Sequence, residues 1–141
     1  MEQKEFKLED MLCPQCGHSF MTQEGIKFSI AYKSQSGIVI LTPIAGDYNC
    51  TISLDLPKGE SVDFYCGVCG THLNTEKYFR AIGVSNGRKF EVYMSSIYGE
   101  KFTLIIDPKA CYSFGQIERH DKVIEKLQKH YFSPKYQSFM G

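Results

Sequence analysis

Two short cysteine pairs are the residues of this sequence whose types and spacing are best suited to chemistry. Cys13 and Cys16 lie in CPQCG, Cys66 and Cys69 lie in CGVCG, and a glycine directly follows each pair. This spacing is typical of a knuckle, a tight turn that directs two sulfurs at one point. Two knuckles supply four thiolates, which complete a tetrahedral shell and leave no open position. The sequence therefore predicts a closed metal site for structural Zn²⁺, with iron as the alternative because it takes the same ligands.

The competing interpretation of these four cysteines is a pair of disulfide bonds. Disulfides are typical of secreted proteins, and the first residues, MEQKE, contain no apolar signal region. The sequence also has no run of about 18 apolar residues, so it predicts no membrane span. We therefore expect a soluble cytoplasmic protein, without a membrane role, whose thiols stay reduced and free for metal.

Length and charge limit the functional classes that remain. The 141 residues suit one domain that buries about two-thirds of its unfolded surface. Basic and acidic side chains number 16 each, so the overall field favours neither nucleic acid nor an anionic membrane. This overall balance is still compatible with a local patch of charge.

Alternating apolar and polar residues predict the strands that must position the knuckles. Between the knuckles, in residues 17–65, strand patterns cover 26–33, 38–41, 51–56 and 62–66. After the second knuckle, runs at 78–84 and 89–95 flank an Asn86-Gly87 turn, and a third run covers 102–106. We expect antiparallel sheets joined by the metal site, with no internal repeat beyond the two knuckles.

Near the end of the chain, the spacing of apolar residues changes from a strand period to a helical period. From Gln116 onward, Ile117, Ile124, Leu127 and Tyr131 fall on one helical face, and Ser133-Pro134 ends the helix. The expected fold is therefore mostly β with a C-terminal α-helix that packs on a sheet. Its predicted parts are an N-terminal arm (1–12), a zinc-knuckle β domain (13–110), and a C-terminal helix with an aromatic tail (111–141).

Other candidate residues carry weaker signals. His18 and His72 follow the knuckles and could reach the metal or a metal-bound sulfur, but we expect both to be bystanders. We expect Cys50, in a strand, to act as a small buried hydrophobic residue. Cys111 lies in a predicted loop near Lys109, which could lower the pKa of its thiol, so a reactive thiol is an alternative rather than the main expectation there.

The C-terminal tail is the expected contact with a protein partner. It combines aromatic rings with a proline break, and its aromatic residues are Tyr131, Phe132, Tyr136 and Phe139. The basic residues of the preceding helix leave a second interpretation open, in which phosphate contacts and base stacking bind single-stranded nucleic acid. No paired carboxylates, phosphate loop or nucleophile motif indicates an enzyme.

Three resemblances accompany these patterns. The knuckles resemble those of zinc-ribbon proteins. Their order and spacing are also similar to the β-tent group, which includes Yippee-type zinc proteins and B-type methionine sulfoxide reductases. Residues 66–73, CGVCGTHL, look like the second knuckle of the reductases, but this chain lacks their Trp-containing segment and their cysteine nucleophile motif. Residues 41–48 and 57–66 resemble small bacterial zinc-knuckle proteins of uncharacterised function.

These observations lead to one principal expectation and two alternatives. The expected function is a non-enzymatic Zn²⁺-binding module for protein–protein interaction. The alternatives are a nucleic-acid-binding zinc-ribbon protein and a redox protein that uses iron or the thiol of Cys111.

Overall fold

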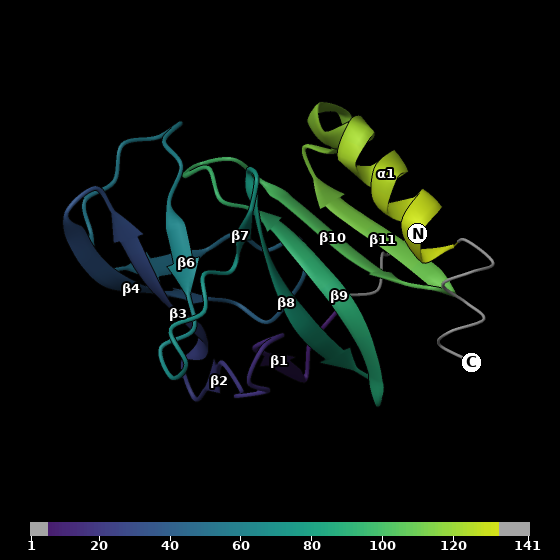
Figure 1. Ribbon diagram of the computed structural model, residues 1–141, viewed down its shortest axis with the longest axis horizontal. Coiled ribbons are helices and arrows are strands. Elements are labelled where there is room, and N and C mark those ends of the chain that lie inside the picture. Colours follow the sequence, from purple (N-terminus) through teal and green to yellow (C-terminus); the bar gives the residue numbers. More distant parts are fainter. Residues whose placement is uncertain (1–5, 133–141) are drawn as a thin grey trace.

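Two antiparallel β-sheets and one helix make up residues 6–132, the part of the chain that this computed structural model describes (Figure 1). The first sheet has the order β2-β3-β4-β5, and β6 also pairs with β3. Its strands are β2 (Met21–Thr22), β3 (Gly25–Tyr32), β4 (Gln35–Leu41), β5 (Cys50–Ile52) and β6 (Asp63–Tyr65).

The second sheet has the order β1-β8-β9-β10-β11, with β7 paired to β8. Its strands are β1 (Asp10–Leu12), β7 (Asn74–Thr75), β8 (Tyr78–Ser85), β9 (Arg88–Ser95), β10 (Phe102–Asp107) and β11 (Ala110–Gly115). A 3₁₀ turn η1 (Ile117–His120) leads into α1 (Asp121–Tyr131), which lies beside β10 and β11 (Figure 1). No helix among the described residues is long and apolar enough to cross a membrane.

The predicted fold class, mostly β with a C-terminal helix, is confirmed. The long strands and the Asn86-Gly87 hairpin lie where the alternating pattern predicts them. Two segments differ from the expectation. The chain turns after Asp107 and returns as β11, so residues 110–115 form a strand rather than a loop. Residues 6–12 are not a loose arm, because β1 pairs with β8 and Leu8 and Met11 are buried.

An internal repeat that the sequence analysis missed organises both sheets. The two knuckles, which begin at Cys13 and Cys66, are 53 positions apart. Adding 53 to the residue numbers of each strand from β1 to β5 places it on its counterpart from β6 to β10. Hairpin residues Lys33 and Asn86, also 53 positions apart, both have positive φ, 55° and 50°. The two halves share few residue types, so the repeat is visible in backbone conformation and pairing rather than in identity.

The two halves exchange their leading strands. β1 precedes the first knuckle but pairs with β8 in the second sheet, while β6 precedes the second knuckle but pairs with β3 in the first sheet. The registers are equivalent, since Leu12 pairs with Ile82 and Tyr65 pairs with Ser29. This reciprocal exchange ties each knuckle to both sheets and places the two knuckles side by side.

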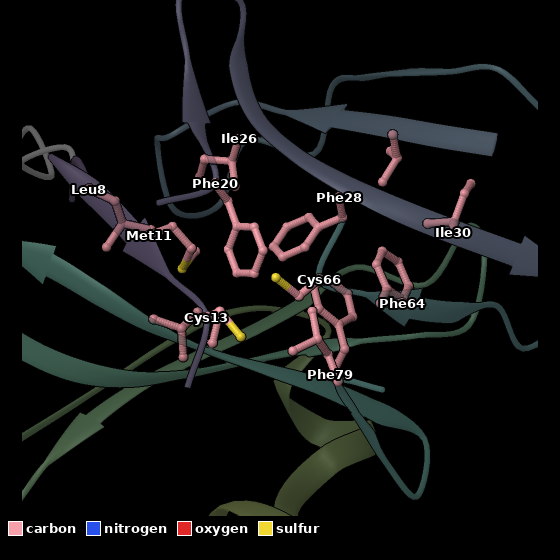
Figure 2. Close-up of a cluster of buried hydrophobic side chains, with 14 of the residues drawn as sticks. Leu8, Met11, Cys13, Phe20, Ile26, Phe28, Ile30, Phe64, Cys66 and Phe79 are labelled. Atoms are coloured by element: carbon pink, nitrogen blue, oxygen red, sulfur yellow. The ribbon is translucent and has the colours of Figure 1, made fainter. Parts of the chain in front are cut away.

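Aromatic side chains fill the space between the sheets, as Figure 2 shows. The ring of Phe28 lies 4.7 Å from Phe20 and 5.3 Å from Phe79, and Phe64 stacks on Phe79 at 3.7 Å. Cys13 and Cys66 belong to the same cluster. The cysteine knuckles therefore lie at the edge of the main core, and burial of these rings supports them.

A second, smaller cluster forms on the outer face of the second sheet, where α1 covers it. Leu104 and Ile106 of β10 are fully buried there, and the helix contributes Tyr131 from its last turn. The predicted helical face is confirmed, because Ile117, Ile124 and Leu127 pack against this cluster.

Candidate metal centre

Each knuckle is built from the same two backbone hydrogen bonds. The amide of the leading cysteine, Cys13 or Cys66, donates to the carbonyl five residues on, over 2.9 and 3.0 Å. The amide of the closing glycine, Gly17 or Gly70, donates back to that cysteine's carbonyl, again over 2.9 and 3.0 Å. These paired bonds fix a tight turn that presents two sulfurs on one side.

The glycines are required by backbone conformation rather than by crowding. Gly17 and Gly70 both have φ of 77°, in the left-handed region. A Cβ atom at either position would meet nothing within 4 Å. The strain of positive φ for other residues therefore explains the glycine.

The structure brings together the four cysteines that the sequence predicts as ligands. Their sulfurs all lie within 4.8 Å of one another, and the contacts Cys13–Cys69 and Cys16–Cys66 measure 3.8 Å each. Four sulfurs bound at about 2.3 Å in a tetrahedron would be about 3.8 Å apart. The group can hold a metal ion, and all the cysteines are free rather than bridged.

The site has a buried side and an exposed side. The first sulfur of each knuckle, from Cys13 or Cys66, is buried against the core, while Cys16 and Cys69 are exposed. The amides of Gln15 and Cys16 point at Cys13 Sγ, 3.4 and 3.5 Å away. Such N–H groups stabilise the negative charge of a thiolate where water cannot.

Electrostatics at the cluster favour a bound cation. The hydroxyl and backbone amide of Thr71 donate to Cys69 Sγ, the hydroxyl over 3.0 Å, and lower the pKa of that thiol to about 6. The His18 backbone lowers the pKa of Cys16, but desolvation and the other three sulfurs outweigh it and raise the pKa to about 12. Four adjoining thiols resist ionising together, whereas a metal ion stabilises all four thiolates.

The two histidines near the knuckles are not part of the cluster. His18 is exposed beside the ring of Phe20. His72 Nε2 lies 2.9 Å from Asp63 Oδ1, and this pair is half exposed. Among the described residues, the sulfur cluster contains cysteines alone.

The expectation for Cys50 is wrong, and the alternative of a reactive thiol at Cys111 is not supported. Cys50 lies in β5 as predicted, but it is exposed rather than buried. Cys111 lies in β11, where burial raises its pKa even though Gln128 Nε2 donates to its sulfur over 3.6 Å. A raised pKa leaves the thiol protonated at neutral pH, which is the opposite of an activated thiol.

The predicted aromatic contact is wrong at Tyr131. Tyr131 is 4% exposed, and its hydroxyl donates to Glu91 Oε1 over 2.9 Å and contacts the Tyr93 hydroxyl at 3.0 Å. Phe132 is half-buried against the same cluster. Tyr136 and Phe139 lie outside the described residues, so their part of the prediction is untested.

One buried polar group escaped the sequence analysis. His120 is 5% exposed and stacks on Phe102 at 4.1 Å, its Nδ1 accepts a 2.6 Å hydrogen bond from Tyr78 Oη, and its Nε2 lies 2.9 Å from Glu100 Oε1. Burial lowers the pKa of His120, and the charge of Glu100 opposes that shift. These contacts fix η1 to the sheet. They join residues 42 positions apart, so no local pattern could reveal them.

Comparison with protein families, curated proteins and solved structures finds no match for this chain. The resemblances to zinc-ribbon proteins, the β-tent group and small bacterial zinc-knuckle proteins therefore stay predictions.

Proposed function

We propose that this protein is a non-enzymatic protein-binding module whose two sheets are held together by structural Zn²⁺. The observation that carries the proposal is the group of four sulfurs within 4.8 Å at the point where the exchanged strands meet. Four thiolates leave no position for water or substrate. Bound Zn²⁺ would supply folding energy, and Cys13, Cys16, Cys66 and Cys69 would hold it.

Burial and pairing of two further titratable groups, Cys111 and His120, support a binding role over catalysis. Cys111 has a raised pKa, and His120 is enclosed by Tyr78, Glu100 and Phe102. Neither offers an activated, accessible group. We also propose the cytoplasm as the compartment, because thiols stay reduced there and remain available to metal.

Metal analysis of the purified full-length chain tests the first part of the proposal. We expect one equivalent of zinc and a colourless protein, and unfolding by a strong chelator, followed by circular dichroism. If the analysis finds iron and the protein absorbs visible light, the site holds the alternative metal. A fully folded protein without any metal would overturn the structural role.

Isolation of bound proteins from source cells, followed by reconstitution with the purified partner, tests the second part. We expect a direct complex with the metal-loaded chain that is lost when the metal is removed. If no purified protein binds, the module is not a protein-binding one.

A further inference from the structure

A groove runs along the outer face of β8, between the end of α1 and the first knuckle. It consists of a hollow of about 1040 Å³ bordered by Pro14, Gln15, Ile82 and Lys109, and a second of about 530 Å³ toward Thr75 and Lys126. Arg80, Glu91 and Tyr131 border both, so the two hollows form one continuous depression. Together they exceed the usual size of a small-molecule pocket.

Pairing between neighbouring strands places the side chains of this groove in rows that run across the strands. Ile82 lies in the middle row, paired with Leu12 on one side and with Glu91 on the other, and Ile106 continues that row. Leu12 and Ile82, both half-buried, line the first hollow and give it an apolar floor, whereas Ile106 also borders it but is fully buried. The next row on one side of Ile82 contains Arg80. The next row on the other side contains Val84, which pairs with Lys89.

Positive charge exceeds negative charge around the first hollow. Four basic side chains line it, namely Arg80, Arg88, Lys89 and Lys109, against two acidic ones, Glu91 and Asp107. Counted without the Cys13 sulfur and its proposed metal, the excess of two positive charges is local, since the whole chain has 16 basic and 16 acidic residues. Electrostatic attraction in the groove therefore differs from that of the molecule as a whole.

The acidic side chains of the groove already have partners. Glu91 Oε1 accepts from Arg80 Nε over 2.8 Å, and Asp107 pairs with Arg88. Only Nε of Arg80 is used in this way, and no described residue accepts from its two terminal nitrogens. Lys89 and Lys109 are exposed and form no ion pair within residues 6–132. These cationic groups remain available to an external carboxylate.

We propose that this groove binds an extended acidic peptide segment of a partner protein, with two carboxylates flanking an apolar side chain. The proposal rests on the proposed function and names its ligand. In an extended chain alternate side chains share a face, and four residues span about 13 Å. That matches the separation of Arg80 from Val84, the position paired with Lys89, with Ile82 midway. One carboxylate binds Arg80, and the other binds Lys89 and Lys109. The apolar side chain between them contacts Ile82.

Single-stranded nucleic acid fits this groove less well. Base stacking needs exposed aromatic rings, but the aromatic residues that line the first hollow, Phe90 and Tyr131, are each 4% exposed. An acidic peptide needs fewer positive charges and uses the aliphatic floor.

Fluorescence anisotropy with a labelled synthetic peptide tests the proposal on the full-length protein. The probe carries two glutamates four positions apart, a leucine midway and serines elsewhere. We expect saturable binding that weakens when ionic strength rises from about 0.01 M to about 0.15 M. The same peptide with glutamines, or with glutamates three positions apart and so on opposite faces, should bind at least about tenfold more weakly.

A charge-reversed variant and a matched control localise the binding. Lys89→Glu combined with Lys109→Glu should weaken binding at least about tenfold. Lys27→Glu combined with Lys58→Glu changes the net charge equally at exposed lysines outside the groove, and it should bind like the natural chain. Lys27 is also the counterpart of Arg80 in the internal repeat. Circular dichroism verifies that both variants fold.

Other results overturn the proposal. Equal binding by both variants, no peptide binding, or tighter groove-dependent binding of a single-stranded oligonucleotide would each do so. If a purified partner binds the groove variant undiminished, the groove assignment falls while the protein-binding function stands. If no protein binds at all, both fall.

Discussion

The two halves of the molecule share a backbone plan, but only the second half buries both faces of its sheet. In the first half Ile40 pairs with Thr51, and in the second half the equivalent pair is Tyr93 with Leu104. Thr51 is exposed, whereas Leu104 is fully buried. The difference arises because β11 and α1 extend the second half only, and α1 covers its outer face (Figure 1).

This comparison separates a framework that both halves share from elements that only one half has. Exchanged strands, knuckles and the core between the sheets occur in both halves, so they make up the common framework. The helix and its cluster belong to the second half only, and the groove beside them also borders the first knuckle. The metal should therefore affect both halves equally, while changes near α1 should affect the second half alone.

The largest expected effect comes from the ligands, which the framework shares. Cys13→Ser and Cys66→Ser should each abolish metal binding and leave the chain largely unfolded. Structural zinc contributes on the order of 10–16 kcal/mol in small peptides, while a domain has about 5–15 kcal/mol of total stability. Metal analysis and circular dichroism measure both changes.

Cys50→Ser is the matched control for the ligand variants, because Cys50 is exposed and outside the cluster. It should keep both metal and fold. A clear difference between Cys13→Ser and Cys66→Ser would show that the two knuckles are not equivalent.

The second effect sharpens the contrast between the outer faces. Leu104→Ala should lower the free energy of unfolding by about 2–5 kcal/mol, because it leaves a cavity under α1. Thr51→Ala, at the equivalent register on an exposed strand, should change it by less than about 0.5 kcal/mol. Urea unfolding measures both, and similar costs would contradict the assignment of α1 to one face.

The third effect concerns the turns of the knuckles. Gly17→Ala and Gly70→Ala should each cost about 1–2 kcal/mol, because alanine is strained at positive φ. The two costs should agree, since the φ values are identical and no atom crowds either position. Gly87→Ala is a control with φ of 74° in an open hairpin turn. Denaturation midpoints compare all three, and a far larger cost in the knuckles would indicate coupling to metal binding.

The smallest effect is a pH dependence from His120, which lies in the second half. Burial lowers the pKa of His120 below its ordinary value of 6.5, so just below pH 6.5 the unfolded chain binds more protons than the folded chain. This contribution to stability is complete above pH 6.5 and is lost as pH falls through the lowered pKa. Urea unfolding from pH 7.5 downward should show the loss.

His120→Gln isolates this contribution from the other groups that titrate in the same range. Its unfolding free energy should fall less steeply with decreasing pH than that of the natural chain. Glu100, which faces His120, corresponds to Asp47 in the first half, where the carboxylate instead accepts from the Asn49 amide. An unchanged pH profile in the variant would contradict the role of His120.

Most of the fold class and the candidate ligands could be predicted because they depend on local patterns. Cysteine spacing defines the knuckles, and alternation defines strands such as β3 and β8. The 53-residue repeat could not be found in this way, because backbone conformation tolerates many residue types. Ile38 and Glu91, for example, occupy equivalent strand positions with opposite chemistry.

The sequence by itself determined which sulfurs could share a metal ion, which stretches are extended and where the helix lies, since short-range geometry and side-chain periodicity set these. Only the tertiary structure decided that the leading strands exchange sheets, that Tyr131 is buried, and that the Cys111 thiol has a raised pKa. It also decided that Arg80, Lys89 and Lys109 border one groove. The physical reason is that burial and long-range pairing depend on which distant strands adjoin, and residue spacing along the chain does not specify that.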